Sequence, residues 1–424
     1  MIDKNLITTT IMNKTKMMYN PKFDIDKIDE KTLNEFRKSG VIVFGTGNYG
    51  ILTLHALKQK NIKLICFVDN NVSHWNTNFK GHKVISPEKL KSEFSNYPVL
   101  VCLLNFKYLK RQLRDLEIKN VYDVNFLFAN INLQNIDTLW SIDRCKVQID
   151  LYLFSITSYK DKNKLKVNSL DLVLTEKCSL KCKDCSNLMQ YYAKPIDEDY
   201  SQLIYSLDKF MDTVDYVQEI RFIGGEPLMY KRIDEVIKKA LAYKNFGRIV
   251  VYTNGTITPK PHKLEVFKND KILFRISDYG SISRNVKQLE KALEENKINF
   301  ITERMTKWQD AAKIKKFDRP INVTKQIFGN CCVNECFTLL HGKLYLCPFA
   351  AHAENLHAIP KSEKDTIDFL KPQNKIELKD KIRKLYLETE YLEACKSCNG
   401  RDFNVASVEA SLQTKSPLKY AKVF

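Results

Sequence analysis

Short apolar runs alternate with longer amphipathic stretches along the first third of the 424-residue chain. Val41–Phe44 is one apolar run, and a second extends from Lys63 to Asp69. Strands that alternate with helices usually pair in parallel within one sheet. The same pattern predicts strands at 99–103 and 120–123, and helices from the first strand to about residue 60, at 87–94 and at 108–116. We therefore predict a Rossmann-like parallel α/β domain over residues 38–128.

The alternation returns after residue 168 and continues for about 140 residues. It predicts strands at 170–175, 219–223, 248–253, 273–277 and near 298–302, with amphipathic helices between them that include 200–212, 231–243 and 284–295. A parallel sheet of this kind is expected to curl into a partial (β/α)6 TIM barrel. The full prediction is a Rossmann-like domain at 38–128, a connector at 129–167, a barrel core at 168–325, a small cysteine-rich extension at 326–400 and a tail at 401–424.

Composition indicates a folded globular protein, with 44% hydrophobic and 28% charged residues. No apolar run approaches the roughly 18 residues needed to span a bilayer. The segment Met1–Lys22 is polar and lacks the apolar core of a signal peptide. Seven of the twelve cysteines lie at metal-type spacing, which favours reduced thiols over disulfides. These features predict a cytoplasmic protein without a membrane span.

The formal net charge is +18, and the lysines are spread along the whole chain. Such a distribution is typical of solvated helix faces, and the alternative is attraction of an anionic small-molecule substrate. No zinc finger, RRM or other nucleic-acid module is recognisable, so a nucleic-acid partner is not expected.

A glycine-rich turn follows the first predicted strand. Gly45, Gly47 and Gly50 form a G-x-G-x-x-G pattern between a strand and a helix, and Asp69 closes the next strand. Such glycines allow a pyrophosphate to approach a helix N-terminus, and the carboxylate suits a ribose hydroxyl. The pattern predicts binding of a dinucleotide or nucleotide-sugar, and the alternative is a tight turn in a domain without a ligand.

Three closely spaced cysteines carry the strongest chemical signal in the chain. Cys178, Cys182 and Cys185 form a C-x3-C-x2-C loop directly after the first strand of the predicted barrel. Three thiolates leave one corner of a four-iron cluster open to a ligand that is not protein. A zinc knuckle is the alternative that the same residues allow.

Other unusual sequences follow the later strands, where barrel enzymes carry their working residues. Gly224, Gly225 and Glu226 follow the second strand, Asn254 follows the third, and Ser277 ends the fourth. With the cysteine loop, these motifs give residues 168–400 a resemblance to radical S-adenosylmethionine (SAM) enzymes. That resemblance implies a [4Fe-4S] cluster on the three cysteines, with SAM on the fourth iron. It also implies a 5′-deoxyadenosyl radical that removes hydrogen from a substrate.

The resemblance assigns roles to the other motif residues. It implies that Gly224, Gly225 and Glu226 form the family's GGE motif beside the methionine ammonium, that Ser277 meets the ribose, and that Asn254 lines the pocket. The residue before the third cysteine is commonly aromatic in this family, but here it is Asp184, so adenine contacts depart from the family pattern.

A second group of cysteines lies near the C-terminus. A His-Gly turn between two short strands, with Leu340 opposite Lys343, is expected to place Cys336 opposite Cys347. The C-x2-C pair of Cys395 and Cys398 completes four thiolates. This region resembles the SPASM and twitch extensions, which implies one auxiliary [4Fe-4S] cluster. Cys331 or Cys332 is an alternative ligand in place of Cys336 or a hydrogen-atom donor, and a structural zinc site remains an alternative to the cluster.

The combined interpretation is a radical SAM oxidoreductase that acts on a small polar, sugar or nucleotide-sugar-like substrate by dehydrogenation, epimerisation or rearrangement. The resemblance implies an external electron donor such as flavodoxin or ferredoxin. Two alternatives remain, a peptide-modifying maturase of SPASM type and a non-catalytic, metal-stabilised nucleotide-binding protein.

Overall fold

The computed structural model describes residues 28–104, 106–129, 131–138, 140–161, 163–401 and 405–423. The polar segment Met1–Lys22, from which no signal peptide was expected, lies outside these residues. The described part of the chain divides into an N-terminal unit that ends at Lys164 and a C-terminal unit that begins at Leu165. Within the described ranges, no helix combines the length and apolar character that a bilayer crossing demands.

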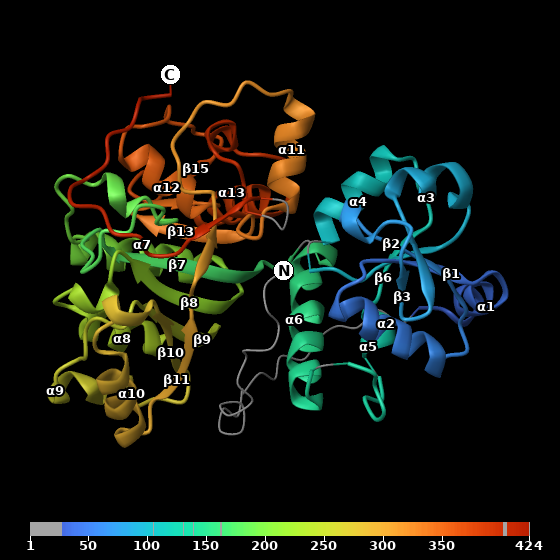
Figure 1. The fold of residues 1–424 in the computed structure, drawn as a ribbon, viewed down its shortest axis with the longest axis horizontal. Coiled ribbons are helices and arrows are strands. Elements are labelled where there is room, and N and C mark those ends of the chain that lie inside the picture. The colour runs from blue at the N-terminus through green and yellow to red at the C-terminus, as the bar shows by residue number, and fades with distance from the viewer. Residues whose placement is uncertain are drawn as a thin grey trace. The chain divides into compact units, whose positions relative to one another are not determined.

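The N-terminal unit is built on a six-stranded sheet with the order β3-β4-β2-β1-β5-β6 (Figure 1). All neighbours pair in parallel except β3 and β4, which form an antiparallel pair at one edge. The strands are β1 (Val41–Phe44), β2 (Leu64–Val68), β3 (Asn78–Phe79), β4 (His82–Ile85), β5 (Val99–Val101) and β6 (Val121–Asp123). The parallel strands follow the order 3-2-1-4-5 that is typical of Rossmann folds, which confirms the predicted class.

Helices complete this unit: α1 (Glu30–Ser39), α2 (Asn48–Gln59), α3 (Pro87–Phe94), α4 (Phe106–Asp115), α5 (Asn125–Phe128) and α6 (Ile142–Lys160), with the short 3-10 turn η1 (Val72–His74). Residues 129–167 were interpreted as a connector, but α6 packs into the core of the N-terminal unit. Tyr152 of α6 is fully buried, donates to the Val101 carbonyl and accepts from the Val124 backbone N–H. The apolar face of α6 therefore belongs to the first core, a role that its mixed composition concealed.

The C-terminal unit contains an open eight-stranded sheet with the order β11-β10-β9-β8-β7-β13-β14-β15 (Figure 1). The strands are β7 (Lys166–Thr175), β8 (Tyr216–Gly224), β9 (Phe246–Thr253), β10 (Ile272–Asp278), β11 (Asn299–Arg304), β13 (Cys336–Leu340), β14 (Lys343–Tyr345) and β15 (Thr366–Asp368). The first six in this order are parallel, and β14 and β15 are antiparallel. The sheet does not close, in agreement with a partial barrel.

The helices of this unit are α7 (Tyr200–Thr213), α8 (Ile233–Ala242), α9 (Pro261–Leu264), α10 (Val286–Glu295), α11 (Ile321–Asn330), α12 (Pro348–Asn355) and α13 (Lys375–Leu387). The 3-10 turns are η2 (Met189–Tyr191), η3 (Pro227–Met229), η4 (Glu265–Phe267), η5 (Gly280–Ile282) and η6 (Glu393–Ser397). Apolar residues of the strands, including Leu172, Phe222 and Phe274, are fully buried in one core cluster with residues of α7, α8 and α10. Side chains alternate along a strand, so the residues between them form a second, inner face of the sheet.

The predicted hairpin forms, and its first strand joins the main sheet. Leu340 pairs with Lys343 as predicted, and the turn residues His341 and Gly342 have φ values of 47° and 76°. Two successive positive φ values are typical of a type I′ turn. β13 also pairs in parallel with β7, so the sixth parallel strand lies beside the first strand instead of the fifth. The hairpin is thus part of the sheet and not of a separate small extension.

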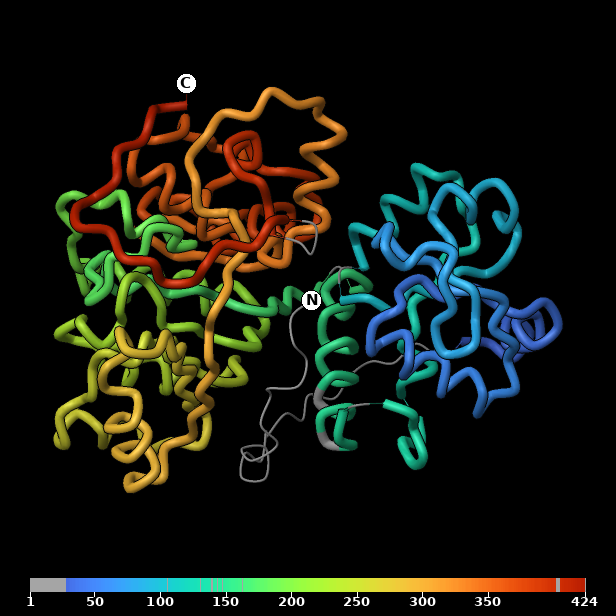
Figure 2. Tube along the Cα trace, in the orientation of Figure 1, coloured from blue at the N-terminus to red at the C-terminus, as the bar shows by residue number. Residues whose placement is uncertain are grey.

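The residues interpreted as a C-terminal tail are packed along the C-terminal unit. Ser407–Glu409 forms β16, which pairs antiparallel with β12 (Lys307–Gln309). Further along, the Leu418 N–H donates to the Gln190 carbonyl at 2.7 Å, and the Tyr420 hydroxyl donates to the Leu356 carbonyl at 2.5 Å. Figure 2 shows this red trace running to the end of the chain. The segment therefore contributes to the structure around the sites described next.

Candidate functional site

The C-x3-C-x2-C loop leaves the carboxyl end of β7 and gathers its three thiols near one another. Cys182 is buried, while Cys178 and Cys185 are partly buried. Burial raises the pKa of the Cys182 thiol to about 12 and raises that of Cys178 and Cys185, and the negative charge of Cys185 would raise the pKa of both other thiols. Buried thiols are reluctant to ionise without a nearby positive charge. A bound metal centre would supply that charge.

The loop is anchored to the ends of the strands by backbone contacts. The Glu226 N–H donates to the Lys177 carbonyl at 2.8 Å, and the Gly225 N–H donates to the Thr175 carbonyl at 2.9 Å. Lys177 also forms an ion pair with Asp197, which precedes α7, at 2.7 Å. The two backbone hydrogen bonds join the cysteine loop to the glycine-rich loop that follows β8.

Glycine is required in this second loop because the backbones approach closely. A Cβ atom at Gly225 would lie 2.2 Å from the Lys177 carbonyl oxygen and 2.9 Å from the Cys178 Cβ. At Gly224, φ is 136° and a Cβ would lie 2.2 Å from the Thr175 oxygen. The two glycines therefore let the second loop rest directly against the cysteine loop.

Glu226 lies where the ends of β8 and β9 meet. Its side chain is fully buried, and its two oxygens accept the backbone N–H groups of Leu228 at 3.2 Å and Asn254 at 2.8 Å. Burial raises the pKa of this carboxyl to about 7, although these hydrogen bonds act in the opposite direction. The carboxylate is the N-cap of η3, and it joins the ends of β8 and β9. Two backbone donors therefore hold Glu226 in place, and its role beside the methionine ammonium remains a prediction.

Asn254 lies against the cysteine loop, and its expected role in lining the pocket remains a prediction. Its Nδ2 is 3.6 Å from the Cys178 sulfur and 3.1 Å from the Ser179 hydroxyl. Its Oδ1 accepts from the Thr256 N–H at 3.0 Å, which fixes the orientation of the amide. The side-chain amide therefore presents a donor to one cysteine.

Two aromatic residues border the same region. Tyr279, two residues after Ser277, interacts electrostatically with all three cysteines of the loop, and Ser277 hydrogen-bonds its phenol. Burial raises the pKa of Tyr279, so its hydroxyl stays protonated. Trp308 packs edge-on against its ring, with centroids 5.5 Å apart. Tyr279 was not singled out from the sequence, and only the fold brings it near the cysteines.

In the second group of cysteines, the structure gathers the alternative set, in which Cys331 takes the place of Cys336. Cys331, Cys347, Cys395 and Cys398 line one cavity of about 20 Å³, together with Arg401. Burial raises the pKa of Cys331 and Cys347 to about 12 and that of Cys398 to about 11. The four thiols therefore surround one small cavity. Cys332 is exposed.

Cys336 was predicted as a ligand of this group, and the structure places it elsewhere. The β13–β14 ladder ends at the pair Thr338–Tyr345, so Cys336 has no partner in Cys347. Cys336 instead lies opposite Ser169 of β7, and the Arg221 guanidinium is 3.6 Å from its sulfur. The prediction extended the hairpin by two pairs too many, because α12 begins at Pro348 and turns the chain away.

Charged side chains cover the inner face of the parallel sheet. Arg221 is paired with Glu219 at 2.9 Å and lies 3.6 Å from Asp171, while Glu219 also contacts Arg248. On the neighbouring strands Arg275 pairs with Glu303 at 3.0 Å. Hydroxyl and carboxylate atoms of Ser169, Asp171 and Thr338 are buried there without a hydrogen-bond partner. Burial raises the pKa of Asp171 to about 6.

Among the described residues, no three His, Cys, Asp or Glu side chains are arranged to hold a single metal ion. An iron–sulfur cubane binds each cysteine through a different iron, so its ligands do not converge on one ion. The donor set of three clustered thiols therefore fits a cluster, while the ligand roles of all seven predicted cysteines remain predictions.

Side chains around the glycine-rich turn of the N-terminal unit already form hydrogen bonds with one another. Asp69 accepts from the Thr46 N–H at 2.9 Å and from its hydroxyl at 2.5 Å, and that hydroxyl contacts His74 at 2.8 Å. A Cβ at Gly50 would lie 2.3 Å from the Gly45 oxygen, whereas Gly47 has open space around it. Gly45 and Gly50 therefore allow the helix to pack closely against the strand, and the Asp69 carboxylate already accepts two hydrogen bonds from Thr46. The predicted nucleotide role of Gly45, Gly47, Gly50 and Asp69 remains a prediction.

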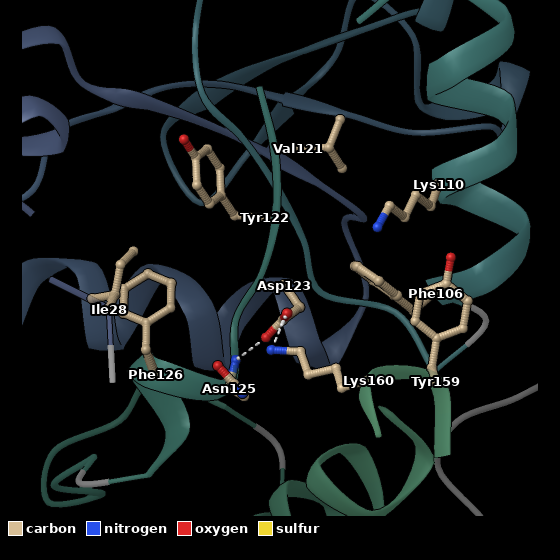
Figure 3. A pocket seen from close by; sticks show the side chains of 10 residues that line it. All are labelled: Ile28, Phe106, Lys110, Val121, Tyr122, Asp123, Asn125, Phe126, Tyr159 and Lys160. Atoms are coloured by element: carbon tan, nitrogen blue, oxygen red, sulfur yellow. Dashed lines mark hydrogen bonds and ion pairs between the residues drawn. The ribbon is translucent and has the colours of Figure 1, made fainter. Parts of the chain in front are cut away.

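The N-terminal unit has a cavity of about 410 Å³ that lies beside β6 and not at the glycine-rich turn (Figure 3). Lys160 reaches Asp123 at 2.6 Å, and Lys110 lies over the Tyr159 ring at 5.4 Å. Its lining residues are Ile28, Phe106, Lys110, Val121, Tyr122, Asp123, Asn125, Phe126, Tyr159 and Lys160. The cavity contains none of the residues of the G-x-G-x-x-G turn.

Two family models match separate parts of the chain. Residues 37–121 match the family described as C2185-like, N-terminal, and residues 172–279 match the Radical SAM superfamily. The second match includes the cysteine loop, the glycine-rich loop, Asn254 and Ser277. The chain therefore carries a radical SAM domain, whose superfamily consists of enzymes that use a [4Fe-4S] cluster and SAM.

Curated relatives within this class include GTP 3′,8-cyclases. The Helicobacter pylori (strain ATCC 700392 / 26695) protein is 25% identical over 146 residues, which cover 30% of this chain and 44% of that protein. The Clostridium perfringens (strain 13 / Type A) protein is 26% identical over 168 residues, which cover 34% of this chain and 49% of that protein. The chain spans about half the length of the curated relatives it matches.

Similar solved structures include native anSMEcpe with bound AdoMet, with a TM-score of 0.37 and 11% identity over 61% of this chain and 94% of that one. BtrN in complex with AdoMet and 2-DOIA gives a TM-score of 0.32 and 15% identity, over 60% of this chain and 98% of that one.

Proposed function

We propose that this protein is a radical SAM oxidoreductase in which Cys178, Cys182 and Cys185 bind a [4Fe-4S] cluster. The observation that carries the proposal is the gathering of three thiols at the carboxyl end of a parallel sheet, within the matched domain. When bound, the cluster and SAM supply a 5′-deoxyadenosyl radical that abstracts hydrogen from a substrate.

The chain's own residues would position these groups and keep water away. Gly224 and Gly225 hold the second loop against the cysteine loop, and Glu226 joins the ends of β8 and β9 through two backbone N–H groups. Asn254 presents an amide donor to Cys178, and Ser277 orients the Tyr279 phenol. We propose that these polar groups line the SAM pocket.

The charged and polar side chains on the inner face of the sheet favour a small, polar and anionic substrate. Partly buried arginines such as Arg221 are held by carboxylates, and the hydroxyls of Ser169 and Thr338 are buried without a hydrogen-bond partner. Buried polar groups without partners are costly unless a ligand or water satisfies them. A sugar or nucleotide-sugar-like molecule, undergoing dehydrogenation, epimerisation or rearrangement, offers matching hydroxyl and charged groups. The matched GTP cyclases are named for a substrate that is likewise polar and anionic.

We further propose that Cys331, Cys347, Cys395 and Cys398 bind one auxiliary cluster in a SPASM- or twitch-like region. Four thiols that line one cavity are a suitable donor set, and zinc in the same place is the competing occupant. All twelve cysteines are free, which agrees with a reducing, cytoplasmic location. An external reductant such as flavodoxin or ferredoxin would supply electrons.

Anaerobic reconstitution with iron and sulfide, followed by reduction in the presence of SAM, tests this proposal. We expect 5′-deoxyadenosine to form in the wild-type protein and to be absent when Cys178, Cys182 and Cys185 are changed together to alanine. Iron content of roughly eight atoms per chain would indicate two clusters and roughly four would indicate one. A wild-type protein that binds zinc at the first site, or that forms no 5′-deoxyadenosine, would refute the proposal.

A further inference from the structure

The C-terminal segment supplies a side chain to the cysteine loop that the sequence motif does not contain. Cys182 and Gln413 form an antiparallel bridge, although 231 positions separate them. The Lys183 N–H donates to the Leu412 carbonyl at 2.6 Å, and the Thr414 N–H donates to the Lys181 carbonyl at 2.7 Å. Residues 411–414, called the strap below, therefore pair with the middle of the loop.

The Gln413 side chain is fixed in one orientation by three contacts. Its Oε1 accepts from the Lys181 N–H at 2.7 Å, and its Nε2 donates to the Ser411 carbonyl at 2.7 Å. The same Nε2 donates to the Cys182 sulfur at 3.2 Å. Because its oxygen and its nitrogen are both hydrogen-bonded to the backbone, the Gln413 amide cannot easily rotate away from the Cys182 sulfur.

The strap is held in place on both sides of Gln413. Upstream, β16 pairs with β12, and the Ala410 N–H donates to the Thr306 carbonyl at 3.0 Å. Downstream, Tyr420 packs edge-on against Tyr191 with ring centroids 5.4 Å apart. The contact between Gln413 and Cys182 is thus part of a continuous, anchored segment.

We infer that Gln413 is a positioning residue for the radical SAM cluster, which it influences by covering Cys182 and donating a hydrogen bond to its sulfur. This inference rests on the proposed cluster at Cys178, Cys182 and Cys185. Hydrogen bonds to ligating sulfurs and shielding from solvent are among the factors that set cluster potentials. A donor stabilises the more negative, reduced state, so Gln413 raises the reduction potential.

The first test measures the midpoint potential of the reconstituted cluster by EPR-monitored titration without SAM. The signal to follow is the one that changes when SAM is added afterwards. We expect Gln413→Leu to shift the potential to more negative values and Gln413→Glu to shift it further, with iron content unchanged. Thr414→Val is the matched control, because its hydroxyl bonds the Lys181 carbonyl at 3.2 Å and does not touch the sulfur. Unchanged potentials in both Gln413 variants, or an equal shift in the control, would overturn the inference.

The second test needs no metal and separates this inference from the proposed function. In metal-free protein, we expect the Lys181 N–H, which donates to Gln413 Oε1 at 2.7 Å, to exchange with deuterium faster in Gln413→Leu than in wild type, by mass spectrometry of peptic peptides. Peptides of the N-terminal unit serve as the internal reference and should not change. Equal exchange at Lys181 in wild type and variant would contradict the role of Gln413 even if a cluster forms. Faster exchange in the variant without cluster formation would contradict only the proposed function.

Discussion

Replacing Gly225 with alanine tests whether close contact between two loops organises the cysteine site. The added Cβ would lie 2.2 Å from the Lys177 carbonyl oxygen, whereas ordinary contacts begin near 3.4 Å. The carbonyl must therefore retreat by about 1 Å, and it is the acceptor for the Glu226 N–H at 2.8 Å. The displacement also moves Cys178, whose Cβ would lie 2.9 Å from the new atom.

The cost follows from these contacts. Overpacking costs about 1–3 kcal/mol, and the strained hydrogen bond adds about 1 kcal/mol. Reduced freedom of the unfolded chain returns about 0.4–1 kcal/mol. A net loss of about 2 kcal/mol corresponds to a fall in Tm of about 4–8 °C for a unit of this size.

Differential scanning calorimetry of the metal-free protein, together with iron content after reconstitution, measures the effect. We expect the transition of the C-terminal unit to fall and iron binding to decrease. Gly47→Ala is the control, since Gly47 has a φ of −76° and no heavy atom lies within 4 Å of the position that an added Cβ would take. It should leave the C-terminal transition and the iron content unchanged. A Gly225→Ala protein with wild-type Tm and full iron content would refute the reasoning.

Two further predictions concern the second cysteine group and the hairpin turn. Cys331→Ala should reduce the metal content and Cys336→Ala should not, because only Cys331 shares the cavity with the other three thiols; elemental analysis that shows equal loss would contradict this. Burial lowers the pKa of His341, but hydrogen bonds and charges of Glu176 and Glu198 outweigh it and raise the pKa to about 10. The interactions of protonated His341 with Glu176 and Glu198 therefore contribute fully to the free energy of unfolding below about pH 6.5, and this contribution is lost as the pH rises through about 10. His341→Asn, which suits the positive φ, should weaken this decline in urea unfolding measured from pH 6 to 10, and an unchanged pH profile would disprove the role of the pair.

Local patterns in the sequence predicted most of the regular structure because they depend on neighbouring residues. The strand Val41–Phe44 and the helix Pro87–Phe94 have the predicted bounds. Apolar runs bounded by polar turns require no knowledge of distant contacts. The segment that contains α6 was misjudged, since its role depends on a core built by residues before it.

The same distinction applies to the candidate site. Cys178, Cys182 and Cys185 could be selected from spacing alone, because one loop contains all three. For the second group, the spacing left Cys331, Cys332 and Cys336 as alternatives, since Cys331 and Cys347 meet only after α11 and α12 have packed.

The sequence by itself determined the α/β class, the strand and helix pattern and the radical SAM motif. The tertiary structure alone decided that Cys331 replaces Cys336 beside the other thiols, that Glu226 caps η3, and that Gln413 covers Cys182. The physical reason is range: helical and strand periodicity act between near neighbours, whereas these contacts join residues that only the packed sheet and its final segment bring together.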